Sequence, residues 1–158
     1  MKRISLTQGR YALVDDEDFE LASRFKWYVT RRGYVRTCVR LGHIGGKRKN
    51  AHVLLHRLIM RPPKDMQVDH KNHIKLDCRR ENMRICTNRE NARNQVIRKG
   101  TSSFKGVCWH KAKGKWLSRI RIDYKIIHLG RFVDEADAAC AYDTAARELF
   151  GEFALTNF

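Results

Sequence analysis

Two short apolar segments, joined by a polar stretch and followed at once by a helix-start signal, constrain the fold of this chain most. Met66–His70 and Asn82–Cys86 have the length and composition of short strands. Thr87 and Glu90 then form a capping box, in which the Thr hydroxyl accepts from the amide of residue 90 and the Glu side chain reaches back to the amide of residue 87. The pattern predicts two strands and a helix that begins at Asn88 and runs to about Lys99.

The N-terminal third predicts short strands and turns. Asp18–Arg24 is expected to form one or two helical turns, and Gly42–Lys49, rich in glycine and lysine, is expected to form a loop. Val53–Met60 is apolar at helical or strand spacing and stops before the prolines at 62 and 63. The segments expected to be strands are Ile4–Thr7, Tyr11–Val14, Lys26–Val29 and Tyr34–Val39.

A break rich in glycine and serine at residues 100–103 is the expected domain boundary. It divides the chain into an N-terminal domain of residues 1–99, with a core at about 54–99, and a C-terminal domain of residues 102–158.

The C-terminal domain is expected to contain three strands and one helix. Trp116–Ile122 alternates strictly, which places its Lys and Arg neighbours together on one sheet face. Phe104–Trp109 and Ile126–Gly130 supply the other strands. Asp134 is the expected N-cap of an alanine-rich helix that ends near Phe150, and its small side chains let the helix lie close to the sheet. The expected fold class is α+β, with N-terminal strands leading into a ββα unit, followed by a three-stranded antiparallel sheet packed on one C-terminal helix.

The charge balance indicates a polyanionic partner. The 158 residues include 33 Lys and Arg against 17 Asp and Glu, a net charge of +16. Residues 134–158 reverse this excess, with one basic and six acidic side chains. The C-terminal domain is therefore expected to turn a basic sheet toward its partner and an acidic helix away from it. Nucleic acid is the expected partner.

Two features bear on the compartment. No apolar run approaches the ~18 residues of a membrane span, and the residues after Met1 lack the apolar core of a secretory signal. The five cysteines are scattered and never spaced CxxC, which favours a reducing compartment over a disulfide framework. The expectation is a soluble intracellular protein with no membrane partner.

Asp69, His70, Asn82 and Asn91 form the sharpest chemical pattern. Two strands and a capped helix allow Asn91, in the first turn, to point back at Asp69 and His70. Carboxylate and amide oxygens are hard ligands that suit a partly hydrated Mg²⁺ or Mn²⁺ ion, which also takes a phosphate oxygen. A neutral His beside that ion can take a proton from water near pH 7. The pattern therefore predicts metal-dependent hydrolysis of a phosphodiester.

The motifs Val-Asp-His, Arg-Glu-Asn-Met-Arg and Asn-Arg-Glu-Asn-Ala-Arg-Asn follow one another within residues 54–95. In this order and spacing they resemble the HNH endonucleases of the phage and mobile-intron homing type, a resemblance that implies a ββα-metal fold. His73-Ile74 departs from the Gly-Asn or Gly-Asp turn that is usual in the family. The roles implied are general base for His70, metal ligand for Asp69 and Asn91, and loop-fixing, base-orienting residue for Asn82.

A second set of motifs lies within residues 102–158: Lys-Gly-Val, Gly-Lys-Trp, Leu-Gly-Arg-Phe and Ala-Tyr-Asp-Thr-Ala-Ala. They resemble the APETALA/ethylene-response-factor (ERF) DNA-binding domain, which lays a three-stranded sheet in the major groove. Cys108 and Ile126 stand where the plant domains use arginine. The residues that this resemblance places on the contacting face are Lys105, His110, Lys115, Arg121 and His128. Arg119 shares that face, although the plant domains have an acidic residue there.

Together these features predict a homing-type endonuclease that hydrolyses double-stranded DNA to 5′-phosphate and 3′-hydroxyl ends and is targeted by its C-terminal domain. The expected cofactor is Mg²⁺ or another divalent metal, with no small-molecule cofactor. One site per chain predicts nicking by a monomer, whereas a double-strand break needs a dimer or two visits. The resemblance implies action in the cytoplasm of a bacterial or phage-infected cell, in association with the nucleoid.

Two alternative functions stay open: a non-catalytic DNA-binding regulator with a nuclease-like fold, and a protein that binds or cleaves RNA. A zinc site that combines Cys78 and Cys86 with His70 and His73 is a further alternative. His56 is expected to pack against the ββα unit and not to bind metal. Trp27 is expected to be a core or sheet-face residue, and Trp116 a core residue.

Overall fold

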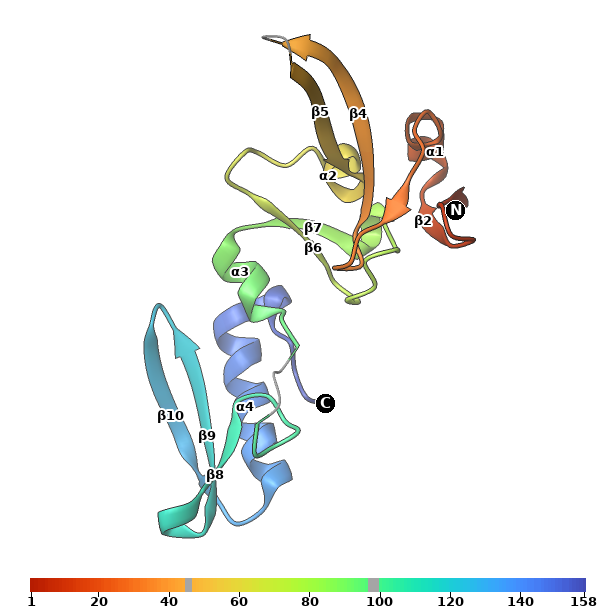
Figure 1. The fold of residues 1–158 in the computed structure, drawn as a ribbon. Helices are drawn as coiled ribbons and strands as arrows, with labels where there is room; N and C mark the ends of the chain where they lie inside the picture. The colour runs from red at the N-terminus through yellow and green to blue at the C-terminus, as the bar shows by residue number, and fades with distance from the viewer. Residues whose placement is uncertain (45–46, 97–99) are drawn as a thin grey trace. The chain divides into compact units, whose positions relative to one another are not determined.

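The computed structural model describes residues 1–44, 47–96 and 100–158, and these form a mixed α and β protein with four α-helices and several small antiparallel sheets (Figure 1). The strands are β1 (Lys2–Ser5), β2 (Tyr11–Val14), β3 (Tyr28–Val29), β4 (Val35–Ile44), β5 (Lys47–Leu54), β6 (Gln67–His70), β7 (Met83–Cys86), β8 (Val107–His110), β9 (Lys115–Ile122) and β10 (Lys125–Phe132). The helices are α1 (Asp16–Ser23), α2 (Leu55–Met60), α3 (Asn88–Arg93) and α4 (Glu135–Phe150), with 3₁₀ turns η1 (Arg80–Asn82), η2 (Lys111–Lys113) and η3 (Gly151–Phe153).

The chain divides into two compact units, residues 1–88 and residues 89–158. The predicted break at 100–103 thus lies inside the second unit. Ser102 there is buried, and its hydroxyl donates to Glu135 Oε1 at 2.6 Å and accepts from the Phe104 amide at 2.9 Å. The glycine and serine content of residues 100–103 predicted a linker, but hydrogen bonds of the Ser102 side chain fix this segment.

The core of the first unit forms around Trp27, as predicted. Trp27 is 1% exposed, and Val14, Val35 and Leu55 around it are fully buried. The indole Nε1 donates to the carbonyl of Ala22 at 2.7 Å, so the ring buries its apolar surface without leaving its polar atom unpaired.

The segment predicted as a loop at 42–49 belongs to a long hairpin, and that prediction is wrong. β4 and β5 pair antiparallel from Arg36 opposite Leu54 to Ile44 opposite Lys47, and the hairpin extends well beyond α2 in Figure 1. A register shift between Arg40 and Gly42 coincides with a φ of 95° at Gly42, a conformation that glycine adopts without steric cost. Residues 45–46 of the predicted loop lie outside the described residues.

β5 ends where α2 begins, which resolves the ambiguous apolar stretch at 53–60 into one strand end and a short helix. Arg61 caps the C-terminus of α2 in the left-handed region with a φ of 46°, and its amide donates to the carbonyl of Arg57 at 3.0 Å.

The N-terminal strands support the connection between β6 and β7. Leu13 of β2 forms an isolated bridge with Asp77. The Leu13 amide donates to the carbonyl of Leu76 at 2.8 Å, and the Leu13 carbonyl accepts from the amide of Cys78 at 2.9 Å. The Asp15 carboxylate accepts from the Arg80 amide at 2.7 Å. Residues far from the expected 54–99 core thus fix the backbone beside His70.

The helix predicted to run from Asn88 to about Lys99 is shorter, since α3 ends at Arg93. Residues 97–99 lie outside the described residues. The carbonyls of Arg93 and Gln95 accept hydrogen bonds from the Lys105 ammonium group. A side chain distant in sequence therefore satisfies carbonyls at the end of this helix.

Residues 102–158, within the second unit, have the predicted arrangement of three strands and one α-helix. The sheet order is β10-β9-β8, and α4 buries Ala138, Ala139 and Ala146 against one face. Asp134 caps α4 as expected, with its Oδ1 accepting from the amides of Ala136 at 2.6 Å and Asp137 at 3.3 Å. Trp116, predicted as a core residue, is partly buried and packs against the cluster of Val107, Ala138 and Ala139. None of the helices in the described parts of the chain is long and apolar enough to cross a membrane.

Candidate active site

Asp69 and Arg84 form a buried ion pair across the two strands of the β6–β7 hairpin. They are directly opposite in register, and Arg84 Nε and Nη2 donate to Asp69 Oδ2 at 2.9 and 2.8 Å. Their side chains are only 8% and 10% exposed. A charge-assisted contact of this kind holds the carboxylate in one orientation at the end of β6.

His70 ends β6 and is buried against an aromatic wall. Its ring meets the His56 ring edge-on, with centroids 5.3 Å apart, and the Tyr34 ring at 6.2 Å. Cys78 Sγ lies 4.0 Å from His70 Nε2. Burial lowers the pKa of His70, and the nearby carboxylates of Asp69 and Asp77 oppose that shift only in part. The imidazole is therefore neutral at neutral pH and can accept a proton.

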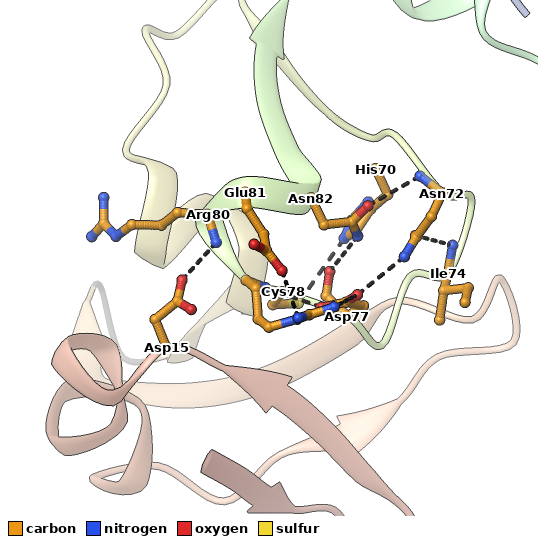
Figure 2. Close-up of polar contacts among 10 residues, drawn as sticks. Asp15, His70, Asn72, Ile74, Asp77, Cys78, Arg80, Glu81 and Asn82 are labelled. Carbon is orange, nitrogen blue, oxygen red and sulfur yellow. Dashed lines mark hydrogen bonds and ion pairs between the residues drawn. The ribbon is translucent and has the colours of Figure 1, made fainter. Parts of the chain in front are cut away.

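Asn82 ties together the two ends of the connection between β6 and β7 (Figure 2). Its Oδ1 accepts from the Asn72 amide at 3.0 Å, and its Nδ2 donates to the Asp77 carbonyl at 2.8 Å. Its own carbonyl accepts from the Lys71 amide at 2.8 Å. A single side chain thus fixes the loop that follows His70.

The Asp77 carboxylate anchors the same loop from its other side. Arg79 Nε and Nη2 each donate to it at 2.8 Å, and Asn72 Nδ2 donates at 3.0 Å. These hydrogen bonds, with Arg79 first, lower the pKa of Asp77. His73, where the related motifs have a glycine turn, adopts the left-handed region with a φ of 62°, so the turn forms although its residue has a side chain.

His56 is buried behind His70, as predicted, and makes the first unit sensitive to acid. It is 5% exposed, and within the described residues its Nδ1 has no hydrogen-bond partner. Burial, followed by the charges of His70 and Arg57, lowers the pKa of His56 to about 3. Between pH 6.5 and about 3 the unfolded chain therefore binds a proton that the folded chain excludes, so stability falls as the pH falls.

We expect lowering the pH from 7 to 5 to cost about 2 kcal/mol of unfolding free energy through this one side chain. His56→Phe keeps a ring in the space and should remove that part of the pH dependence. Urea unfolding of both proteins at pH 7 and pH 5 measures it. Equal pH dependence in the two proteins would contradict the assignment.

Asn91 lies on α3 and is half-buried, within the second unit, whereas Asp69 and His70 belong to the first. Its shared role with Asp69 stays a prediction. Within the described residues no group of three or more His, Cys, Asp and Glu side chains is placed to hold a metal ion. The donor chemistry suits Mg²⁺, which binds through one or two carboxylates and keeps several waters. Cys78 and Cys86, considered above for zinc, are both buried.

The residues expected to contact DNA occupy one face of the β8–β10 sheet, with one exception. Lys115, Arg119, Arg121 and His128 are exposed, and Arg119 lies directly opposite His128. Residues paired in this way point to the same side of the sheet. His110 ends β8 opposite Lys115, partly buried.

Lys105 is the exception, because it lies in the turn before β8 and not on the sheet face. Its ammonium group donates to the carbonyls of Arg93 and Gln95. Phe104–Trp109 was predicted as a strand, and β8 begins only at Val107. The difference follows from Gly106, which turns the chain with a φ of 79°.

The sequence analysis missed three residues that belong to these surfaces. Arg84 was missed because its position opposite Asp69 depends on strand register. Arg131 shares the exposed sheet face with Leu117, since a bulge between His128 and Gly130 shifts its register. Tyr34 reaches the His56 and His70 rings only through the tertiary fold.

The β4–β5 hairpin carries a second basic surface. Residues 21–64 contain no Asp or Glu. The register and the bulge place one set of basic and polar side chains on the same face. Its members are Arg36, Arg40, His43, Arg48, Asn50 and His52.

These features define a nuclease-like unit with a buried His-Asp pair, and comparison with known proteins identifies its class. The model of the HNH endonuclease family matches residues 53–93. An uncharacterized HNH endonuclease of Acanthamoeba polyphaga mimivirus is 31% identical over 153 residues, which cover 95% of this chain and 76% of that protein. The chain therefore belongs to the HNH endonuclease family and is a nuclease.

Plant transcription factors share a shorter similarity with this chain. An APETALA2-like protein of Oryza sativa is 45% identical over 62 residues, which are 38% of this chain and 14% of that protein. An AP2-like ethylene-responsive transcription factor of Arabidopsis thaliana is 40% identical over 62 residues, again 38% of this chain and 18% of that protein. The similarity covers only a small part of each plant protein.

Proposed function

We propose that this protein is a metal-dependent, homing-type endonuclease that hydrolyses phosphodiester bonds in duplex DNA. The observation that carries the proposal is the buried, neutral His70 beside the buried Asp69 carboxylate, in a chain that belongs to the HNH endonuclease family. We place its action on DNA in the cytoplasm.

His70 is the proposed general base, which takes a proton from the attacking water. Asp69 and Asn91 are the proposed ligands of a divalent ion, Mg²⁺ or Mn²⁺, and together they leave most of its coordination sites to water and phosphate oxygens. When bound, the ion supplies charge stabilisation for the scissile phosphate and the departing 3′ oxygen. Asn82 holds the loop after His70, and this loop keeps the imidazole oriented. The products are a 5′-phosphate and a 3′-hydroxyl.

We propose that residues 102–158 form an APETALA/ERF-type targeting domain that binds duplex DNA through its sheet. The exposed basic face supports this role, and so does the similarity to plant proteins that include an AP2-like ethylene-responsive transcription factor. Phosphate contacts supply most of the affinity of such a face, and a few side chains read bases. The basic face of the β4–β5 hairpin, including Arg48, is proposed to add phosphate contacts.

The test is nicking of supercoiled plasmid and of a random-sequence duplex library, with Mg²⁺, with Mn²⁺ and with excess EDTA. Open-circle product is expected with either metal and none with EDTA, because the site lacks its charge stabilisation without an ion. Inert protein on both substrates, combined with tight duplex binding, would support a non-catalytic regulator. Preferential binding of single-stranded RNA over duplex DNA would support the RNA alternative.

A further inference from the structure

Lys105 is a half-buried cation with backbone partners at the end of α3. Its Nζ donates to the carbonyl of Arg93 and, at 3.0 Å, to the carbonyl of Gln95. Burial lowers the pKa of Lys105 to about 8, so the side chain still carries its proton at pH 7. A charged donor on helix-terminal carbonyls stabilises them more than a neutral one does.

The backbone of Lys105 is in turn fixed to α4. Its amide donates to Asn157 Oδ1 at 2.6 Å, and its carbonyl accepts from Asn157 Nδ2 at 3.2 Å. Asn157 donates from its own amide at 2.9 Å and from Nδ2 at 2.8 Å to the carboxylate of Asp143, which is 1% exposed. A continuous chain of hydrogen bonds thus leads from the buried face of α4, through Asn157 and Lys105, to the end of α3.

Two further contacts hold α3 to the same unit. The Arg93 guanidinium lies over the Phe150 ring, 4.7 Å from its centroid. Arg89 Nη1 pairs with Asp123 Oδ1 at 3.0 Å in the exposed β9–β10 turn. Exposed pairs of this kind contribute little, so the half-buried Lys105 contacts are expected to stabilise the helix end more than the Arg89–Asp123 pair does.

We propose that Lys105 is a positioning residue that holds α3, the helix that carries Asn91, and that it is not one of the side chains that contact DNA. Its effect on α3 follows from the hydrogen bonds alone. Its effect on metal binding rests on the proposed function, because only there is Asn91 a ligand.

Amide hydrogen exchange of α3, followed by NMR, tests the positioning without any need for activity. Lys105→Met removes the donor and keeps the length of the side chain. We expect the α3 amides to exchange about tenfold faster, while the amides of β9 and β10 keep their wild-type rates and so report an intact sheet. Wild-type protection of α3 in Lys105→Met would overturn the proposal.

A measurement on the wild-type protein keeps the proposal testable if Lys105→Met does not fold. Reductive methylation, read by mass spectrometry, should modify exposed Lys115 quickly and Lys105 at least tenfold more slowly, with duplex DNA present or absent. Rapid labelling of Lys105 that duplex DNA suppresses would show a DNA contact and overturn the proposal.

Lys115→Met, on the exposed sheet face, is the matched control for the functional effect. It should weaken duplex binding and lower the salt dependence by about one unit of slope, with unchanged Mg²⁺ dependence. Lys105→Met should leave duplex affinity within about twofold and raise the Mg²⁺ concentration for half-maximal nicking about tenfold. Weakened DNA binding with unchanged Mg²⁺ dependence in Lys105→Met would overturn the proposal. A wild-type protein that never nicks would refute the proposed function and leave the exchange and labelling results decisive for Lys105.

Discussion

His70→Ala is expected to lower the rate of metal-dependent nicking by about 10² to 10⁴-fold, the usual contribution of a positioned general base. Duplex DNA binding should be unchanged, because His70 is 5% exposed and is not one of the side chains on the basic faces of the hairpin and the sheet. Rates of open-circle formation at saturating Mg²⁺, with binding measured separately, give the comparison.

His73→Asn serves as the control for loss of an imidazole close to the site. His73 is exposed and has a φ of 62°, a conformation that Asn tolerates, so this variant should retain wild-type nicking. Burial lowers the pKa of His70 below the 6.5 of an ordinary histidine, so the base stays neutral as the pH falls to 6.5. The nicking rate of the wild-type protein should therefore begin to fall only below pH 6.5. His70→Ala with nearly wild-type nicking would remove His70 from the mechanism.

Gly106→Ala is expected to destabilise the second unit by about 3 kcal/mol or more. A Cβ at this position would lie 1.9 Å from Cδ2 and 2.4 Å from Cε2 of Tyr142, a ring that is itself buried beneath the sheet. Gly106 also has a φ of 79°, which a side chain disfavours. Both the helix–sheet packing and the turn before β8 must therefore shift to admit one methyl group.

Gly114→Ala, in the same unit, separates the cost of the positive φ from the cost of the steric clash with Tyr142. Gly114 has a φ of 58°, but its Cβ would meet nothing within 4 Å, so only the conformational cost of about 1 kcal/mol remains. Urea unfolding followed by far-UV circular dichroism compares the two variants. Equal losses of stability would show that the close approach of Tyr142 is not what requires glycine at 106.

Local signals predicted much of the second unit. The alternation of Trp116–Ile122 and the cap at Asp134 act within a few residues, and both appear in the structure as expected. The β4–β5 hairpin was missed for the opposite reason. Glycine and lysine have low strand propensity, and the segment is held in a strand by pairing with residues on the other side of the turn.

In the candidate site, too, some residues could be predicted from local sequence and others depend on the tertiary fold. Asp69, His70 and Asn82 could be named from short motifs, because their spacing follows from two strands and a loop. Arg84 and His56 meet them only through register and packing. Lys105 was assigned to the sheet face by its place in a motif, whereas its hydrogen bonds depend on where α3 ends.

The attachment of α3 to the second unit determines where this protein can be recombined with others. A chimera that exchanges residues 102–158 for another domain would remove Lys105, Asn157 and Phe150. α3 would then lose the hydrogen bond from Lys105 to the Arg93 carbonyl and the contact of Arg93 with the Phe150 ring. A junction after Asn88, the first residue of α3, transfers residues 89–93 of the helix together with these contacts. A segment exchanged at this junction, which carries the proposed targeting domain, therefore includes Asn91, so a proposed metal ligand would be exchanged with it.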